Sequence, residues 1–397
     1  MTLCMKKLLL LLSFSGALFL LGGCWDRTEI NDLAIATSAA IDQKENDQIE
    51  LSLEIFLPKA FGGGSAQGGQ AGGQGITLVI SQTGSNMADA LSKLQGVLPR
   101  EIFWGHCKTF VFSEAVAKKG IIDHLDFLLR QPDIRERAYI FVSEKKARRI
   151  LEQKTNLEPY TGQALLEQTD FGIGMRVTMQ ELDEMLVSRM QSAALPYLKI
   201  KTQKKSEEEK FRFADISGVA VFRKDKMIGR LSEERTRGLL WLRDEIKGYT
   251  VSASPPGVNG VVSVNPVSVY SKMTPSIVDG KWRILLTIKT DGVIVQNSTP
   301  LDFFNPTSLA SVEAALQDSI ETRVRESLEK TQHQMKADVA NFAAEFYREY
   351  PEEWKQVENH WPEKLSEVEV EVDARMIIRS QGNLILPANE KEGGEQW

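Results

Sequence analysis

The chain has 397 residues, of which 42% are hydrophobic and 26% are charged, and its formal net charge is −6 at pH 7. This length predicts two or three domains, and this composition is ordinary for a globular chain with buried hydrophobic cores. The mild acidity argues against a nucleic-acid-binding protein, which needs clustered Lys and Arg, and against electrostatic adhesion to anionic lipid.

The first residues predict a lipoprotein signal peptide over residues 1–23. Lys6 and Lys7 precede an apolar stretch, 8–21, that is about as long as the core of a signal peptide and too short to cross a membrane as a helix. A branched residue, two small residues and a cysteine end the signal: Leu21, Gly22, Gly23 and Cys24. They resemble a lipobox, the motif whose cysteine thiol receives a diacylglycerol. Cys24 is therefore the predicted lipidation site, and the alternative is a plain secretory signal followed by a chance cysteine.

The cysteines predict a chain without internal disulfides. There are three, Cys4, Cys24 and Cys107. Cys4 leaves with the signal peptide and a lipidated Cys24 has no free thiol, so Cys107 has no partner. Stability must then come from buried cores, which a chain of this length can supply.

Residues 24–200 predict an N-terminal domain of mixed α and β structure. Apolar and polar residues alternate over 49–55, which is the period of a half-buried strand. A segment rich in Gly and Gln, 61–75, then loses all hydrophobic periodicity and predicts a flexible exposed loop. Strand-like and helix-like stretches alternate after it, and Asn86 is a predicted helix cap.

The next segment predicts a linker and a small middle domain. Residues 201–210 are charged and aperiodic, which is typical of a linker or a hairpin tip. Residues 211–256 predict a small α+β domain, with a hairpin that turns at Lys224-Asp225-Lys226 and a helix after it. The break at 254–257 ends this unit.

Residues 257–397 predict a C-terminal domain with a sheet and a long helix. Asp279-Gly280 lies between two strand-like runs, which is a strong hairpin signal, and Asn305-Pro306 predicts the start of a helix. Apolar residues then recur at spacings of three, four or seven. They predict one helix over about 307–350, with a kink or an exposed patch at the polar interruption around His333. The predicted fold class is α+β, with a last domain in which an antiparallel-rich sheet surrounds this helix.

The sequence predicts no catalytic residue, no metal site and no cofactor. His106 and Cys107 are adjacent on a predicted strand, where neighbouring side chains point to opposite faces, so they cannot act together as base and nucleophile. The four His and Cys107 show no ligand spacing such as C-x-x-C or H-E-x-x-H, and no G-x-S-x-G motif is present. We therefore predict a protein that is not an enzyme.

Several separated motifs resemble the Ger(x)C, or GerC-type, family of spore germination lipoproteins. They occur in the family's order and cover nearly all of the chain from Leu21 onward. The matching segments are the lipobox with 25–30, the stretch 100–143 with Gly105-His106, 117–120 and 130–135 as landmarks, the stretch 216–242, and Tyr350, Trp354 and Trp361.

This resemblance implies the C subunit of a nutrient germinant receptor, required for nutrient-triggered spore germination. It implies two integral membrane partners, of the A and B types, and a position on the outer face of the spore inner membrane, held by acyl chains such as palmitate at Cys24. It also implies three domains and no enzyme activity, and it carries over no ligand site.

Two other functions stay open at this point. A solute-binding lipoprotein of a transporter predicts two similar lobes and a cleft, whereas the sequence shows three dissimilar units and no internal repeat. A cell-wall hydrolase predicts turnover of peptidoglycan fragments.

Overall fold

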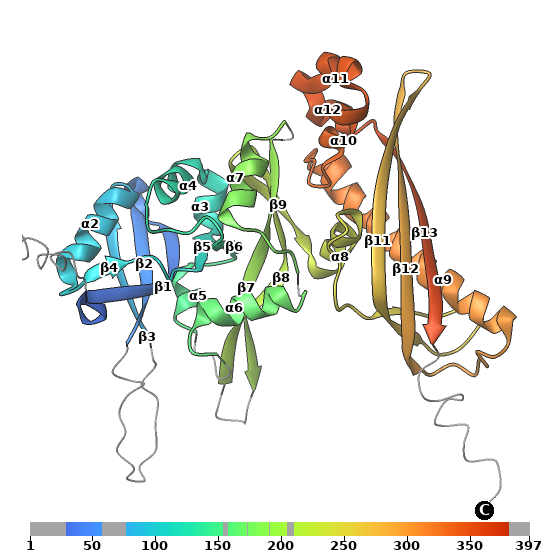
Figure 1. Ribbon diagram of the computed structural model, residues 1–397, viewed down its shortest axis with the longest axis horizontal. Helices are drawn as coiled ribbons and strands as arrows, with labels where there is room; N and C mark the ends of the chain where they lie inside the picture. Colours follow the sequence, from blue (N-terminus) through green and yellow to red (C-terminus); the bar gives the residue numbers. More distant parts are fainter. Residues whose placement is uncertain are drawn as a thin grey trace, which may run out of the picture.

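A computed structural model describes residues 29–57, 77–153, 158–172, 174–189, 191–204 and 210–380. Two sheets of nine and four strands organise the chain, and helices cover both (Figure 1). The α+β fold class predicted from the sequence is confirmed. Among the described residues, no helix has both the length and the apolar character that crossing a bilayer requires.

The large sheet has the strand order β3-β2-β1-β5-β6-β7-β8-β9, and the short β4 pairs with β1. Strands β1, β5, β6 and β7 run parallel, and the other neighbours in this order are antiparallel. The strands are β1 (Leu33–Gln43), β2 (Ile49–Phe56), β3 (Thr77–Gly84), β4 (Glu101–Phe103), β5 (Thr109–Ser113), β6 (Tyr139–Ser143), β7 (Ser192–Lys204), β8 (Lys210–Arg223) and β9 (Lys226–Ser232).

Helices cover both faces of the large sheet, because its central strands are apolar on both sides. In β5, Phe110 and Phe112 enter one core, and Val111 enters the other. The first face is covered by α2 (Met87–Val97), α3 (Glu114–Lys119), α4 (Ile122–Leu129) and α7 (Met179–Val187), and the second by α5 (Arg148–Leu151) and α6 (Thr161–Asp170). Asn86 caps α2 as predicted, because its side chain accepts the Asp89 N–H at 2.9 Å.

The first two strands of segment 211–256 belong to the large sheet, whereas the sequence predicts a separate middle domain there. Its hairpin exists, with Lys224 in the turn at a φ of 53°, but β8 and β9 extend the large sheet. The reason is that β8 pairs with β7 along almost its whole length. The charged segment 201–210, predicted to be a linker or a hairpin tip, therefore connects two paired strands. The chain then continues into α8 (Glu233–Leu242).

The small sheet has the order β10-β11-β12-β13. Its strands are β10 (Val251–Ala253), β11 (Val262–Val278), β12 (Lys281–Asn297) and β13 (Glu369–Ser380). The predicted hairpin at Asp279-Gly280 is confirmed: both residues have positive φ angles, 51° and 75°, as a type I′ turn requires. One face packs on α9 (Pro306–Leu328), whose stripe of Val312, Leu316, Ile320 and Val324 is fully buried.

The prediction of one helix over about 307–350 is wrong. α9 passes into a π-helical turn at Glu329–Gln334, and a separate α10 (Phe342–Glu349) follows, with α11 (Pro351–Val357) and α12 (Trp361–Leu365) after it. Asp338 holds the start of the new helix, since its buried side chain accepts the N–H groups of Phe342 and Ala343 at 2.9 and 2.7 Å. The apolar spacing continues across the break because both helices bury a stripe in the same core.

The two sheets share one hydrophobic core through the contact of α8 with α9. Gly238 of α8 faces the backbone of α9, and a Cβ added there would lie 2.0 Å from the Arg323 carbonyl oxygen. Polar contacts support this junction: Arg243 Nη1 donates to the Val339 carbonyl at 2.9 Å, and the Asp338 N–H donates to Ser192 Oγ of β7 at 3.2 Å.

Replacing Gly238 with alanine should force α8 away from α9, because the added methyl group would overlap the Arg323 carbonyl oxygen and only a shift of a whole helix can relieve the overlap. We expect the free energy of unfolding to fall by about 1–3 kcal/mol in denaturant titrations of the full-length chain. Gly96→Ala is the matched control: Gly96 lies in α2, an added Cβ meets nothing within 4 Å, and stability should stay equal or rise by up to about 1 kcal/mol. Equal effects of the two changes would contradict the close helix contact.

Candidate functional site

The predicted lipidation site lies outside the described residues. This holds for Cys24 and for the lipobox residues Leu21, Gly22 and Gly23, so lipidation stays a prediction. The described chain begins at Glu29 and joins the large sheet at Leu33. A tether at Cys24 would therefore hold the amino-terminal end of β1.

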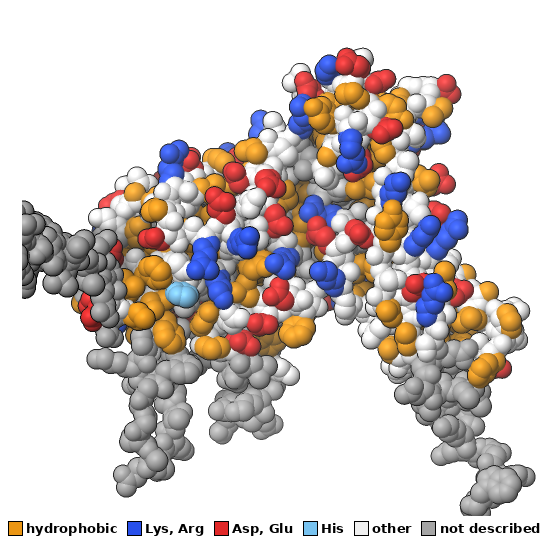
Figure 2. All heavy atoms as spheres, viewed as in Figure 1, with side chains coloured by type: hydrophobic (Ala, Val, Ile, Leu, Met, Phe, Trp, Pro, Cys, Tyr) orange, Lys and Arg blue, Asp and Glu red, His pale blue; other side chains and the backbone are white. Residues whose placement is uncertain are grey.

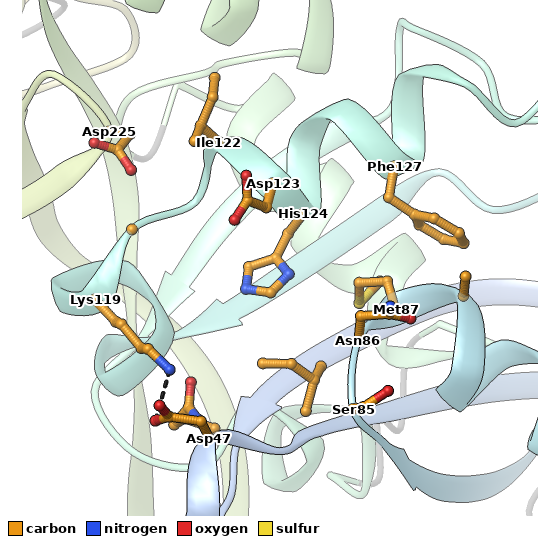
Figure 3. Close-up of a pocket in the computed structure, with 14 residues that line it drawn as sticks. Asp47, Ser85, Asn86, Met87, Lys119, Ile122, Asp123, His124, Phe127 and Asp225 are labelled. Carbon is orange, nitrogen blue, oxygen red and sulfur yellow. Dashed lines mark hydrogen bonds and ion pairs between the residues drawn. The ribbon is translucent and has the colours of Figure 1, made fainter.

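A cavity lined by ionisable side chains lies at the opposite end of β1. It has a volume of about 440 Å³ and is named here the α4 cavity (Figure 3). Four separate parts of the chain line it: the β1–β2 turn, the start of α2, the α3–α4 connection and the β8–β9 turn. The lining residues are Gln43, Asp47, Ile49, 85–88, Lys119, Gly120, 122–124, Phe127 and Asp225.

Three aspartates, one lysine and one histidine are the ionisable side chains of the α4 cavity. Lys119 Nζ forms an ion pair with Asp47 Oδ1 at 2.8 Å, which joins the α3 end to the β1–β2 turn (Figure 3). The pair is exposed, so its contribution to stability is small. His124 is half-buried, and this burial lowers the pKa of its imidazole, which is therefore neutral at pH 7. Asp123 and Asp225 add two further carboxylates.

Gly120 fixes one wall of the α4 cavity. Its φ of 138° suits glycine, and an added Cβ would lie 2.4 Å from Asp225 Oδ2. The next N–H, that of Ile121, donates to the Asp225 carbonyl at 3.0 Å. Glycine therefore lets the β8–β9 turn close against the α3–α4 connection, and this explains the glycine at the end of the 117–120 landmark.

The serine hydroxyl and the imidazole of the α4 cavity do not form a hydrogen-bonded pair of nucleophile and base. Its serine hydroxyl, Ser85 Oγ, donates to Asp89 Oδ2 at 3.3 Å, and His124 does not activate it. Within the described ranges, no three His, Cys, Asp or Glu side chains come together as metal ligands. A cavity of this size, with apolar Ile49, Met87 and Phe127 beside carboxylates, can hold a small polar molecule or a partner's side chain.

Cys107 and His106 lie in a turn, which corrects their predicted place on a strand. The Cys107 N–H donates to the Trp104 carbonyl at 2.7 Å, and β5 begins only at Thr109. Cys107 is 1% exposed, and burial raises the pKa of its thiol, so the thiolate that reacts as a nucleophile does not form. His106 is exposed and places its ring at the edge of Phe103.

Sequence reasoning missed two buried carboxylates that begin helices. Asp42, at the end of β1, accepts the N–H groups of Ala147 and Arg148 at 2.7 and 2.8 Å and so holds the start of α5. Glu54 of β2 accepts the Thr161 N–H at 3.2 Å at the start of α6. Burial raises the pKa of both carboxyls. The available signal was an acidic residue inside an apolar strand pattern.

Comparison with known proteins gives the family. The model of the spore germination protein N-terminal domain matches residues 26–200, and that of the spore germination B3/GerAC-like C-terminal domain matches residues 217–382. The chain belongs to the GerC-type family of spore germination proteins. GerC-type relatives in Bacillus subtilis (strain 168) include spore germination protein KC, which is 28% identical over 96% of each chain, and spore germination protein B3, which is 22% identical over 92% of this chain and 96% of that protein.

A solved structure also shares the GerC-type fold. The crystal structure of the GerBC protein superposes with a TM-score of 0.52 and 19% sequence identity, over 86% of this chain and 96% of that chain.

The buried Glu54 should make stability depend on pH. A carboxyl whose pKa is raised in the folded state binds more protons than in the unfolded chain, so folding stability falls as pH rises from about 4.5, its ordinary pKa, through the raised value. Glu54→Gln removes this titration. The unfolding free energy of the original chain minus that of the variant should therefore decrease between about pH 4.5 and pH 7.

Denaturant titrations across this pH range measure the difference. The exposed Glu326→Gln serves as the control, and its difference should stay level. A Glu54 difference that grows with pH would mean that hydrogen bonds to the carboxylate outweigh its burial.

Proposed function

We propose that this chain is a lipid-anchored, non-enzymatic subunit of a spore nutrient germinant receptor. Two successive GerC-type domain models over nearly the whole chain carry this proposal. The relatives named spore germination protein A3, B3 and KC support a role in germination. The partners would be two integral membrane subunits, of the A and B types, and the site the outer face of the spore inner membrane.

The proposed mechanism is binding at a membrane surface. An acyl group on Cys24 would hold the body beside the membrane subunits, and sharing a membrane raises the effective concentration of the partners, so weak contacts suffice. A buried, protonated Cys107 and a serine in the α4 cavity that bonds a carboxylate rather than a base agree with a protein that presents surfaces.

A solute-binding lipoprotein is the second candidate, because the α4 cavity could hold a small molecule. That class predicts two similar lobes with a cleft between them. Here the two sheets have nine and four strands, and one continuous core joins them at α8 and α9. The receptor subunit is therefore the better supported proposal.

Replacing Cys24 with alanine should release the protein from the membrane or leave its signal uncleaved, because the thioether can form only at that thiol. The measurement is detergent partitioning together with metabolic labelling by a fatty acid, and circular dichroism should show a folded body. Cys107→Ala is the control and should stay acylated. Acylation of the Cys24→Ala protein would contradict the assignment of the anchor.

Spores that lack the gene should lose the response to one set of nutrients only. Germination is assayed with nutrients and with a trigger that bypasses receptors, and the second response should be intact because the germination machinery downstream is unchanged. Failure of both responses, or a defect in vegetative growth, would indicate a wall enzyme or a general transport protein instead. The purified chain should also show no turnover of peptidoglycan fragments.

A further inference from the structure

A second depression lies at the same edge of the large sheet as the α4 cavity, at the ends of β6 and β7. It has a volume of about 490 Å³ and is named here the α5 groove. Its lining residues are Ser143, Glu144, Lys145, Arg149, Glu152, Gln153, Leu198, Ile200, Thr202 and Arg212. Thr202 and Arg212 are direct partners on β7 and β8, so both strands form one wall.

Three cations of the α5 groove have no carboxylate partner among the described residues. Lys145, Arg149 and Arg212 are exposed, and within the described residues they make no ion pair. The two carboxylates of the lining form ion pairs with cations that do not line the groove. Glu144 pairs with Lys199 at 3.3 Å and with Arg230 at 3.7 Å, and Glu152 pairs with Arg148 at 2.7 Å. The groove is therefore a local positive site on a chain whose net charge is −6.

The fold holds these cations in place. Ala147, Ile150 and Leu151 of the α5 segment are buried in the second core, which leaves Lys145 and Arg149 on the outer side of the turn. The start of α5 is fixed by the two hydrogen bonds to Asp42. On the face drawn in Figure 2, several Lys and Arg side chains lie over the part of the large sheet where Figure 1 shows β5, β6 and β7.

We propose that the α5 groove binds an acidic, extended segment of a protein partner. Three cations along the wall and the rim of one polar depression complement carboxylates spaced along a chain, and Arg can hold a carboxylate with two parallel hydrogen bonds. Thr202 adds a hydroxyl to the same wall.

The position of the groove favours a protein over a lipid surface, and this step rests on the proposed anchor at Cys24. Asp42, which holds α5, lies at the far end of β1 from Leu33, about 30 Å away at about 3.3 Å per residue. The chain from Cys24 to Glu29 spans at most about 18 Å. With β1 upright on this tether, the α5 groove would lie on the side away from the bilayer.

The test uses the full-length chain in detergent and a fluorescent peptide in which Glu and Ser alternate, with a Lys and Ser peptide as its opposite. The groove variant carries Lys145→Glu, Arg149→Glu and Arg212→Glu. The control variant has the same net charge and carries Lys108→Glu, Lys272→Glu and Lys289→Glu, all at exposed positions away from the groove. A neutral variant, with Gln at the three groove positions, guards against unfolding caused by repulsion from Glu144 and Glu152.

The acidic peptide should bind the original chain and the control variant with the same affinity. It should bind the groove variant at least tenfold more weakly, and the neutral variant with an intermediate affinity. Added salt should weaken this binding, because the contacts are between charges at the surface. Equal binding by the groove and control variants would overturn the proposal, as would equal binding of the Lys peptide.

Vesicles of phosphatidylcholine and phosphatidylglycerol in equal parts test the lipid alternative. Vesicle binding that the groove variant alone loses, with its peptide binding unchanged, would make this a lipid-binding face and overturn the proposal. The Cys24→Ala protein should bind the acidic peptide normally, so a failure of the anchor assignment is distinguishable from a failure of the groove.

Discussion

The contact between α8 and α9 is the constraint on which the rest of the molecule depends. Gly238 lets the two helix backbones meet, and the buried stripe of α9 then joins the small sheet to the core of the large one. A side chain at Gly238 would separate the sheets and expose apolar surface on both. The two sheets are therefore joined by one continuous hydrophobic core.

Buried carboxylates decide where several helices begin. Asp42, Glu54 and Asp338 each leave water to accept backbone N–H groups at the start of a helix, although burial raises the pKa of each carboxyl. Their hydrogen bonds hold short helices that would not be stable alone. The α5 groove exists because Asp42 fixes the α5 turn at the end of β1, and the α4 cavity lies at the same edge of the sheet. Binding features thus collect at the end of β1 opposite the predicted tether.

Local signals in the sequence predicted local structure well. The turn at Asp279-Gly280 and the cap at Asn86 follow from residue types that only a few backbone conformations favour. Contacts between segments far apart in the chain were harder to predict from the sequence. The pairing of β8 with β7 gives no periodic signal that could separate it from an independent hairpin. The polar interruption around His333 predicted a kink, and the π-helical turn Glu329–Gln334 lies there. The start of a separate helix after it was not predicted, because the apolar spacing resumed and the hydrogen bonds that begin this helix reach a buried side chain.

The α4 cavity and the α5 groove also could not be predicted from the sequence. Each is lined from segments that lie far apart in the chain, such as Gln43 with Asp225 and Lys145 with Arg212. Overall acidity argued against binding to nucleic acid and anionic lipid, but a net charge is a sum over the whole chain and does not show where cations gather locally. The family resemblance, in contrast, could be read directly, because its motifs are short contiguous stretches.

We propose that this chain works as part of a membrane assembly. Purification of the tagged chain from spore inner membranes in mild detergent, followed by mass spectrometry, tests this proposal. Two integral membrane proteins should be recovered with the chain in a constant ratio, and a control tag on an unrelated lipoprotein should recover neither. Recovery as a free monomer that carries a bound small solute would contradict the receptor assignment and favour the transporter lipoprotein.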